Sequence, residues 1–241
     1  SSVSLVVQPL DTATRTLAIN ADTPRNPASV AKLVTTFAAL DQLGPAYTWA
    51  TEALSDSPVQ DGVLKGALYL RSNGDPKFNH ERLWLLLRQL RDAGIREIAG
   101  DLVLDRSAFA TQSASPGDFD GRPLRPYNAL PDALFFHYNS VTLRLRPGEN
   151  TVAVGMQPQP DTLRIDNRLR LNQAKECGDW RERLEAMPLS SNGVTRLVLS
   201  GDYPQVCGER EWHIQALRPN ELLGGTFRSL WQELGGRFSG T

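Results

Sequence analysis

The sequence predicts an α+β fold, in which a core that carries helices is interrupted by a long, strand-rich insertion. Three observations lead to this prediction. Helical and strand-like segments occur near both ends of the chain, short strands alternate with turns between them, and no internal repeat relates one segment to another. Because the helices and strands are partly segregated along the chain, the pattern favours α+β over a doubly wound sheet.

The chain opens with a predicted hairpin and a predicted helix. Residues 3–7 and 16–20 are strand-like, and Asp11-Thr12-Ala13-Thr14 forms the turn between them. A Pro-rich loop follows, and then a helix is expected from about residue 28 to Gly44-Pro45, which ends it. The apolar residues of this helix recur at helical spacing; they are Val30, Leu33, Val34, Phe37 and Leu40.

The middle of the chain is predicted to consist mainly of strands. One amphipathic helix is expected at residues 80–93, and a last helix at about 220–234. Residues 107–132 are rich in Pro, Gly, Ser and Asp, and a loop of this length is usually functional or poorly ordered. The expected strands are residues 48–54, 62–71, 98–105, 140–146, 151–156, 162–165 and 195–200.

Composition excludes several classes of function. The 241 residues carry a net charge of −1 and no run of Lys or Arg, which argues against nucleic-acid binding and against a membrane-surface patch. No apolar stretch approaches the ~20 residues that span a bilayer, so a transmembrane protein is not expected. No phosphate-binding loop and no metal-ligand spacing occurs in the sequence, so we expect neither a cofactor nor a metal.

The start of the chain and its cysteines bear on the compartment. Ser1 leads directly into strand-like sequence, so either the protein is cytoplasmic or a signal peptide has been removed. The two cysteines, Cys177 and Cys207, lack the His partners of a zinc site and the spacing of a redox dithiol. Taken alone, they are compatible with two buried thiols or with one structural disulfide in an exported protein.

A candidate nucleophile lies at the start of the first helix. Ser29 and Lys32 are three residues apart, which places both side chains on one helical face within reach of each other. A serine hydroxyl needs an adjacent base, and a neutral lysine can serve as one. With sixteen Ser and four Lys in the chain, chance gives about 0.3 such S-x-x-K matches, so the pair alone is also explained by a capping Ser and a solvated Lys. Its position after a hairpin and a Pro-rich loop, at the start of a strongly apolar helix, favours the nucleophile.

Further stretches carry a resemblance to a known family. The sequence resembles the class C low-molecular-mass penicillin-binding proteins, the D-alanyl-D-alanine carboxypeptidase/endopeptidase family, over essentially its whole length. The stretches that carry the resemblance are Asn26-Pro27-Ala28-Ser29-Val30-Ala31-Lys32, Ala39-Leu40-Asp41-Gln42-Leu43-Gly44-Pro45, Gly62-Val63-Leu64-Lys65-Gly66, Gly74-Asp75-Pro76, Tyr138-Asn139-Ser140-Val141 and Phe238-Ser239-Gly240-Thr241.

The resemblance implies a fold, an activity and partners. It implies a β-lactamase/transpeptidase-like serine peptidase core made of residues 1–50 and 219–241, with an inserted region at 51–218 and a nested subdomain at about 76–150. It implies a periplasmic enzyme, its signal peptide removed, that cleaves peptidoglycan stem peptides and is inhibited by β-lactams. Ser29 is then the nucleophile and Lys32 the general base. Cys177 and Cys207 match a disulfide of the family.

Two motifs of the family are missing from this sequence. Such enzymes use S-x-x-K, S-x-N and K-T-G, and only the first is convincing here. Ser190-Ser191-Asn192 fits S-x-N, but Gly193 and a strand follow it, so we interpret Asn192-Gly193 as a turn. Ser239-Gly240-Thr241 lacks the Lys of K-T-G. We therefore expect this chain to be an N-terminal portion that needs the remaining C-terminal part of the protein and releases no appreciable D-alanine alone.

The long loop supplies weaker candidates. In the family this region recognises the free end of the stem-peptide side chain, which implies Tyr127 as an aromatic wall and Asp120 as the acid nearest to the substrate ammonium. A solvated acidic turn is the alternative interpretation. The three histidines, His80, His137 and His213, are isolated in sequence and are expected to be structural.

Two rival functions remain open. The first is a β-lactamase or esterase that shares the S-x-x-K core, against which slow deacylation of bound penicillin would argue. The second is a non-catalytic peptidoglycan-binding scaffold that has lost the later motifs. The length of the natural reading frame distinguishes the scaffold hypothesis from the enzyme, because a continuation of ~200 residues with S-x-N and K-T-G would exclude a scaffold.

Overall fold

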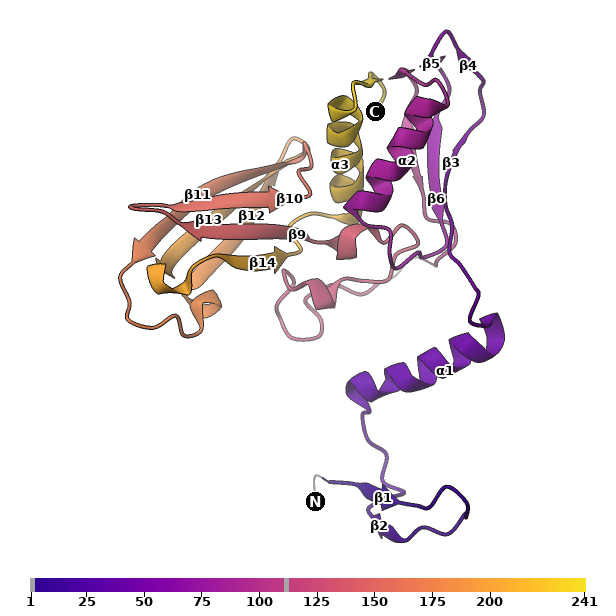
Figure 1. The fold of residues 1–241 in the computed structure, drawn as a ribbon, viewed down its shortest axis with the longest axis vertical. Coiled ribbons are helices and arrows are strands. Elements are labelled where there is room, and N and C mark those ends of the chain that lie inside the picture. Colours follow the sequence, from indigo (N-terminus) through magenta and orange to yellow (C-terminus); the bar gives the residue numbers. More distant parts are fainter. Residues whose placement is uncertain (1–2, 111–112) are drawn as a thin grey trace. The chain divides into compact units, whose positions relative to one another are not determined.

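The computed structural model describes residues 3–110 and 113–241, and the chain forms two compact units, Ser1–Thr48 (unit 1) and Trp49–Thr241 (unit 2). Figure 1 shows the elements of each unit. The two units are described separately. Helix α3 and strand β15 belong to unit 2, whereas residues 1–48 form unit 1. The grouping of residues 219–241 with residues 1–50 in one core therefore stays a prediction.

Unit 1 contains the predicted hairpin and the predicted helix. Strand β1 (Leu5–Val7) pairs antiparallel with β2 (Leu17–Ile19). A 3₁₀ turn, η1 (Ala28–Val30), leads into helix α1 (Ala31–Leu43), so the first turn of the predicted helix is 3₁₀ rather than α. Gly44 ends α1 with a φ of 77°, a conformation that favours glycine. The apolar side chains of η1 and α1 at Val30, Leu33, Val34, Phe37 and Leu40 are 56% to 72% exposed.

Two small sheets begin unit 2. One has the order β3-β6-β8, from β3 (Thr51–Ser55), β6 (Leu68–Ser72) and β8 (Leu102–Asp105). The other has the order β15-β7-β5-β4, from β15 (Arg237–Phe238), β7 (Glu97–Ile98), β5 (Val63–Leu64) and β4 (Val59–Gln60). The predicted strands at residues 62–71 and 98–105 are therefore each divided between the two sheets.

Glycines explain this division. The chain passes from one sheet to the other at Gly66 and again at Gly100, and the two backbones cross there in close contact. A Cβ on Gly100 would lie 2.1 Å from the carbonyl oxygen of Gly66, and a Cβ on Gly240 would lie 1.9 Å from the carbonyl oxygen of Gly100. Since only a residue without a side chain permits such an approach, these glycines set the places where the strands leave one sheet for the other.

Two helices cover the middle of unit 2. Helix α2 (His80–Asp92) begins at Asn79, whose side chain accepts a hydrogen bond from the Arg82 amide at 3.0 Å. Helix α3 (Pro219–Glu233) has proline at its first position and is capped by Glu221, which accepts from the Arg218 amide at 3.0 Å. Both confirm the predicted helices. In Figure 1 the two helices lie side by side, and their buried residues, among them Leu83, Leu87 and Phe227, belong to the main hydrophobic core.

Two further sheets of three strands each belong to unit 2 and lie on one side of α3 in Figure 1. Strands β10 (Val152–Gln157), β9 (Val141–Pro147) and β14 (Arg210–Ile214) form one antiparallel sheet in that order. Strands β11 (Leu163–Asn172), β13 (Val194–Pro204) and β12 (Leu184–Ser191) form the other, with β11 parallel and β12 antiparallel to β13.

The prediction was incomplete in this region. Strands β12 and β14 were not predicted, and β11 and β13 extend well beyond residues 162–165 and 195–200. Pro188 lies inside β12, which is an edge strand of its sheet and therefore tolerates a residue without an amide hydrogen. Strand β14 carries Arg210, Glu211 and His213 on a half-exposed edge, so its apolar signal is weak.

Candidate active site

The Ser29–Lys32 pair is brought together at the start of α1. The amide of Ala28 donates to Asn26 Oδ1 at 2.9 Å, and the amide of Val30 donates to the Pro27 carbonyl at 3.0 Å. These two bonds fold the Pro-rich loop into the 3₁₀ turn that carries Ser29. Lys32 Nζ donates to Ser29 Oγ at 3.0 Å, as the three-residue spacing predicted.

The residue before Ser29 has an unusual backbone. Ala28 has a φ of 45°, in the left-handed region that non-glycine residues rarely adopt. Such conformations persist only where the surrounding structure imposes them, and they cluster at functional sites. Here the Ala28 amide is held by the Asn26 side chain, which accepts a hydrogen bond from it. The arrangement offers a serine hydroxyl beside an amine, which is the geometry of a base-activated nucleophile.

The loop candidates Asp120 and Tyr127 are also brought together, within unit 2. The Tyr127 hydroxyl donates to Asp120 Oδ2 and accepts from Arg125 Nη1 at 2.6 Å. Asp120 Oδ1 accepts from Asn128 Nδ2 at 2.7 Å and from the Arg122 amide at 2.9 Å. Arg125 Nη1 lies 3.5 Å from Asp120 Oδ2 as an ion pair. The Tyr127 hydroxyl and the Asp120 carboxylate raise the pKa of Arg125 above its ordinary value, with the hydrogen bond from Arg125 to Tyr127 as the largest cause.

This arrangement differs from a solvated acidic turn. The Asp120 side chain is 20% exposed and accepts from three separate donors, while the Tyr127 residue is 61% exposed. The cluster therefore fixes the aromatic side chain at the surface and uses the carboxylate as its anchor. Asn128 was not among the predicted site residues. It is buried in the short helix η2 (Pro126–Asn128), and an amide next to a Pro-Tyr pair gives no sequence signal of such a role.

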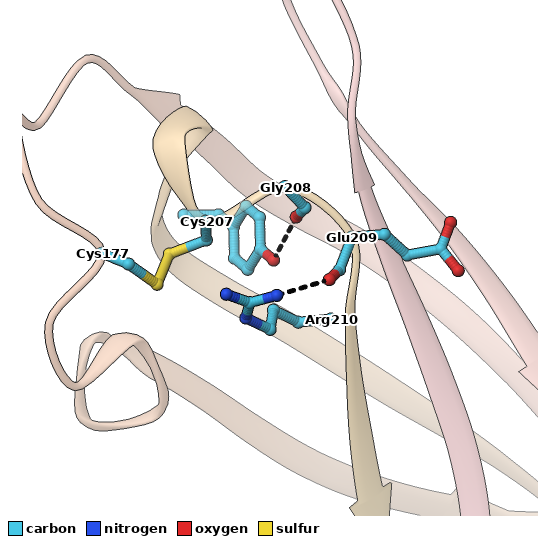
Figure 2. Close-up of a disulfide and its surroundings, with 6 residues drawn as sticks. Cys177, Cys207, Gly208, Glu209 and Arg210 are labelled. Carbon is cyan, nitrogen blue, oxygen red and sulfur yellow. Dashed lines mark hydrogen bonds between the residues drawn. A yellow bond between two sulfur atoms is a disulfide. The ribbon is translucent and has the colours of Figure 1, made fainter.

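The two cysteines form a disulfide in unit 2, as the resemblance implied. Cys177 and Cys207 have Cα atoms 4.8 Å apart. Figure 2 shows the bond beside the segment Gly208–Arg210, where the hydroxyl of Tyr203 donates to the Gly208 carbonyl at 2.8 Å. Cys207 and Tyr203 are buried, so the disulfide joins the loop before η4 (Trp180–Arg183) to the hydrophobic core.

The S-x-N-like stretch is part of a hairpin. Asn192 and Gly193 connect β12 to β13 with φ values of 50° and 75°, and positive φ at both positions is the signature of a type I′ turn. Ser190 Oγ lies 2.8 Å from Thr195 Oγ1 across the hairpin. Ser239-Gly240-Thr241 continues from β15, where Thr241 Oγ1 donates to Asp101 Oδ1 at 2.7 Å.

The histidines have structural surroundings. His137 Nδ1 accepts from the His80 amide at 3.3 Å, and His213 Nδ1 lies 2.9 Å from Thr142 Oγ1. Burial, with smaller contributions from the charges of His80 and His213, lowers the pKa of His137 to about 4. Burial also lowers the pKa of His80, against a smaller opposing effect of Glu233. Within the described ranges, no three His, Cys, Asp or Glu side chains converge in a way that would hold a metal.

The described helices also bear on the membrane prediction. Within residues 3–110 and 113–241, each helix is either too short or too polar to cross a bilayer.

Comparisons with known proteins agree on one family. The sequence model of the D-Ala-D-Ala carboxypeptidase 3 (S13) family matches residues 1–241. D-alanyl-D-alanine carboxypeptidase DacB of Haemophilus influenzae is 39% identical over 90 residues, which are 37% of this chain and 19% of that protein. D-alanyl-D-alanine carboxypeptidase of Actinomadura sp. is 36% identical over 87 residues, which are 36% of this chain and 16% of that protein.

Solved structures agree with the fold. The crystal structure of penicillin binding protein 4 (dacB) from Haemophilus influenzae superposes with a TM-score of 0.76 at 23% identity, covering 98% of this chain and 51% of that one. The same protein complexed with a novel β-lactam superposes with a TM-score of 0.68 at 22% identity, covering 98% and 50%. The chain thus spans about half the length of the solved structures it matches.

Proposed function

This chain belongs to the D-Ala-D-Ala carboxypeptidase 3 (S13) family, and from that membership we propose that Ser29 is the acylable nucleophile of a serine-type D-Ala-D-Ala carboxypeptidase. The observation that carries the proposal is the 3.0 Å contact between Lys32 Nζ and Ser29 Oγ. The proposed substrate is a peptidoglycan stem peptide that ends in D-Ala-D-Ala.

The proposed reaction is acyl transfer. Lys32 in its neutral form accepts the hydroxyl proton while Ser29 Oγ attacks the carbonyl carbon of the penultimate D-alanine. Backbone amides, one of them that of Ser29, stabilise the tetrahedral oxyanion. The peptide C–N bond then breaks, the leaving D-alanine amine takes up a proton, and water later hydrolyses the ester. A β-lactam acylates the same hydroxyl by opening its ring and is released slowly. The complex of the Haemophilus protein with a β-lactam supports this part of the proposal.

The Asp120–Tyr127 cluster is proposed to contact the stem-peptide side chain. Its exposed ring, held by the Asp120 carboxylate and by Arg125, provides a rigid wall. The proposed second role, in which Asp120 receives the substrate ammonium, requires the ammonium to compete with donors already on both carboxylate oxygens.

Further groups of the catalytic centre are proposed to come from elsewhere in the natural protein. The chain carries S-x-x-K, and the relatives are about twice as long as the part it matches. We therefore propose that S-x-N and K-T-G motifs in a C-terminal part complete the site. The predicted periplasmic location is supported by the disulfide, because such bonds persist in oxidising compartments.

Intact-mass spectrometry after incubation with a labelled penicillin tests the nucleophile. The full-length natural protein and its Ser190→Ala variant are expected to gain one penicillin adduct, while Ser29→Ala gains none. Ser190 is the matched control because it is the serine of the S-x-N-like stretch and lies in a hairpin. Absence of an adduct on the parent, or an adduct on Ser29→Ala, would refute the assignment. Rapid loss of the adduct would instead favour the β-lactamase alternative.

A further inference from the structure

Unit 2 contains a cavity whose lining does not include Asp120 or Tyr127. Its volume is about 690 Å³, and it lies between residues 106–110, 116, 123–124 and 130–133 on one side and residues 215–219 on the other. The volume falls in the range of small-molecule sites, roughly 300–1,000 Å³. Its walls are mainly apolar and include Phe109, Leu124, Leu130 and Leu217.

Three polar side chains in the cavity wall have unpaired buried atoms. Arg106 Nη2, Asn139 Oδ1 and Gln215 Oε1 are shielded from solvent and make no hydrogen bond with any residue that the structure describes. Buried polar groups are almost always paired in native proteins, so each exception requires an explanation. That three of them lie around one cavity indicates a common explanation, namely a ligand that pairs with all three.

The charge of the cavity limits the kind of ligand. Arg106 Nε lies 3.0 Å from Asp132 Oδ1, and the Asp132 side chain is only 11% exposed. The Asp132 carboxylate therefore already balances the charge of the Arg106 guanidinium. Arg106 Nη2 is still available as a hydrogen-bond donor, but the ion pair as a whole carries no net charge that would attract an anion. A neutral carbonyl oxygen fits this donor better than a second anion, because an anion would face the Asp132 charge.

The backbone holds Asn139 in place at a cost. His137, Tyr138 and Asn139 have successive φ values of 48°, 55° and 50°, three left-handed residues in a row with no glycine among them. Such runs are unfavourable for side chains with a Cβ and are retained where the surrounding structure, often for functional reasons, requires them. Here the turn directs Asn139, which is 5% exposed, into the wall of the cavity.

Gln215 joins the two walls. The backbone amide of Gln215 donates a hydrogen bond to the carbonyl of Leu124 at 2.9 Å. This bond connects the segment before α3 to the long loop. The side-chain oxygens of Gln215 and Asn139 are therefore two acceptors that line the same cavity as the Arg106 Nη2 donor.

We propose that this cavity binds a short apolar peptide segment through its backbone. A peptide segment with two or more peptide groups offers a carbonyl oxygen, which matches Arg106 Nη2, and two amide hydrogens, which match Asn139 Oδ1 and Gln215 Oε1. Apolar side chains of the peptide occupy the surface formed by Phe109, Leu124 and their neighbours. The inference does not depend on Ser29 or on the proposed peptidase activity.

NMR titration of the ¹⁵N-labelled chain tests the proposal. The probe is acetyl-Leu-Leu-N-methylamide, a neutral peptide with apolar side chains. Saturable shifts of the side-chain amide signals of Asn139 and Gln215 are expected. Gln215→Met removes the acceptor at similar volume and should weaken binding about fivefold, while Gln60→Met on β4, outside the cavity, should leave it unchanged.

A second experiment changes the probe peptide instead of the protein, so its result does not depend on whether the Gln215→Met variant folds. Methylation of the central peptide nitrogen removes a donor and is expected to weaken binding about fivefold or more. The free acid acetyl-Leu-Leu should bind more weakly than the methylamide because of Asp132. Absence of saturable shifts at ~10 mM probe, equal binding by Gln215→Met, or equal binding of the N-methylated probe would overturn the proposal. So would loss of binding in the full-length natural protein, because its own polypeptide would then occupy the cavity.

Discussion

Reduction of the Cys177–Cys207 disulfide is expected to lower the free energy of unfolding of unit 2 by about 3.6 kcal/mol. The bond closes a loop with a sequence separation of 30, and the chain-entropy model gives an entropy loss in the unfolded state of about 12 cal/mol/K for such a loop. Both cysteines lie in unit 2, so the loss of stability is expected in the unfolding of unit 2 itself. For a unit of about 190 residues, the same loss corresponds to a decrease in Tm of roughly 7–15 °C.

Urea unfolding followed by tryptophan fluorescence measures this loss. The oxidised parent, the parent in a reducing agent and a Cys177→Ala/Cys207→Ala double variant are compared. With a slope of about 2 kcal/mol/M, the midpoint should fall by roughly 1.8 M on reduction and on substitution. The reducing agent should not shift the double variant, which controls for other effects of the reagent. If the parent unfolds at the same midpoint with and without the reducing agent, the disulfide does not constrain the unfolded chain as argued.

Three further predictions concern the stability of unit 2. His137 has a pKa of about 4 in the folded protein and an ordinary value near 6.5 when unfolded, so the unfolded state binds more protons between these two pH values. The free energy of unfolding should therefore fall as pH decreases from 6.5 to 4, by on the order of 2 kcal/mol for a partly screened ring. Urea midpoints at pH 7 and pH 4.5 measure this loss, and a His137→Gln variant with the same pH dependence would contradict the prediction. Gly193→Ala should lower the free energy of unfolding by about 1 kcal/mol or more, because φ is 75° at this position. The control is Gly155→Ala in β10, where a Cβ meets only ordinary contacts, and it should leave the midpoint of the same urea titration unchanged. Trp231→Phe should cost about 1–3 kcal/mol in thermal unfolding, because it removes the hydrogen bond from the buried indole Nε1 to the Arg237 carbonyl at 2.8 Å and places a smaller ring in the core. An unchanged Tm would show that the bond is dispensable.

Local chemistry made parts of this structure predictable. The Ser29–Lys32 contact follows from a three-residue spacing on a helix, which requires no knowledge of the rest of the fold. The turn at Asn192-Gly193 follows from the preference of these two residues for positive φ. Helix α2 follows from its leucines and from the capping residue Asn79.

Long-range contacts account for what could not be predicted. The strands of residues 62–71 and 98–105 appeared continuous, because the crossing of Gly66 and Gly100 joins segments 34 residues apart and is invisible in either segment alone. The left-handed turn at residues 137–139 contains no glycine, and although His and Asn tolerate positive φ, three such residues in a row are not predictable from residue preference. Strand β12 depends on pairing with β13 along its whole length and has little β-propensity of its own around Pro188.

The hydrogen bonds of Asp120 change the interpretation of the predicted substrate wall. An acid that receives a substrate ammonium must have a free acceptor and a net negative charge around it. Three donors, among them Tyr127 and Asn128, already occupy most of the acceptor sites of the Asp120 carboxylate, and Arg125 balances its charge. The same contacts make Tyr127 rigid, and rigidity is the property that a recognition wall requires. The geometry therefore favours the aromatic role of Tyr127, with Asp120 as its positioning residue. If Asp120 met the ammonium directly, Asp120→Asn and Tyr127→Phe would differ strongly in stem-peptide KM; if it positions the ring, both should raise KM to a similar extent in the full-length protein.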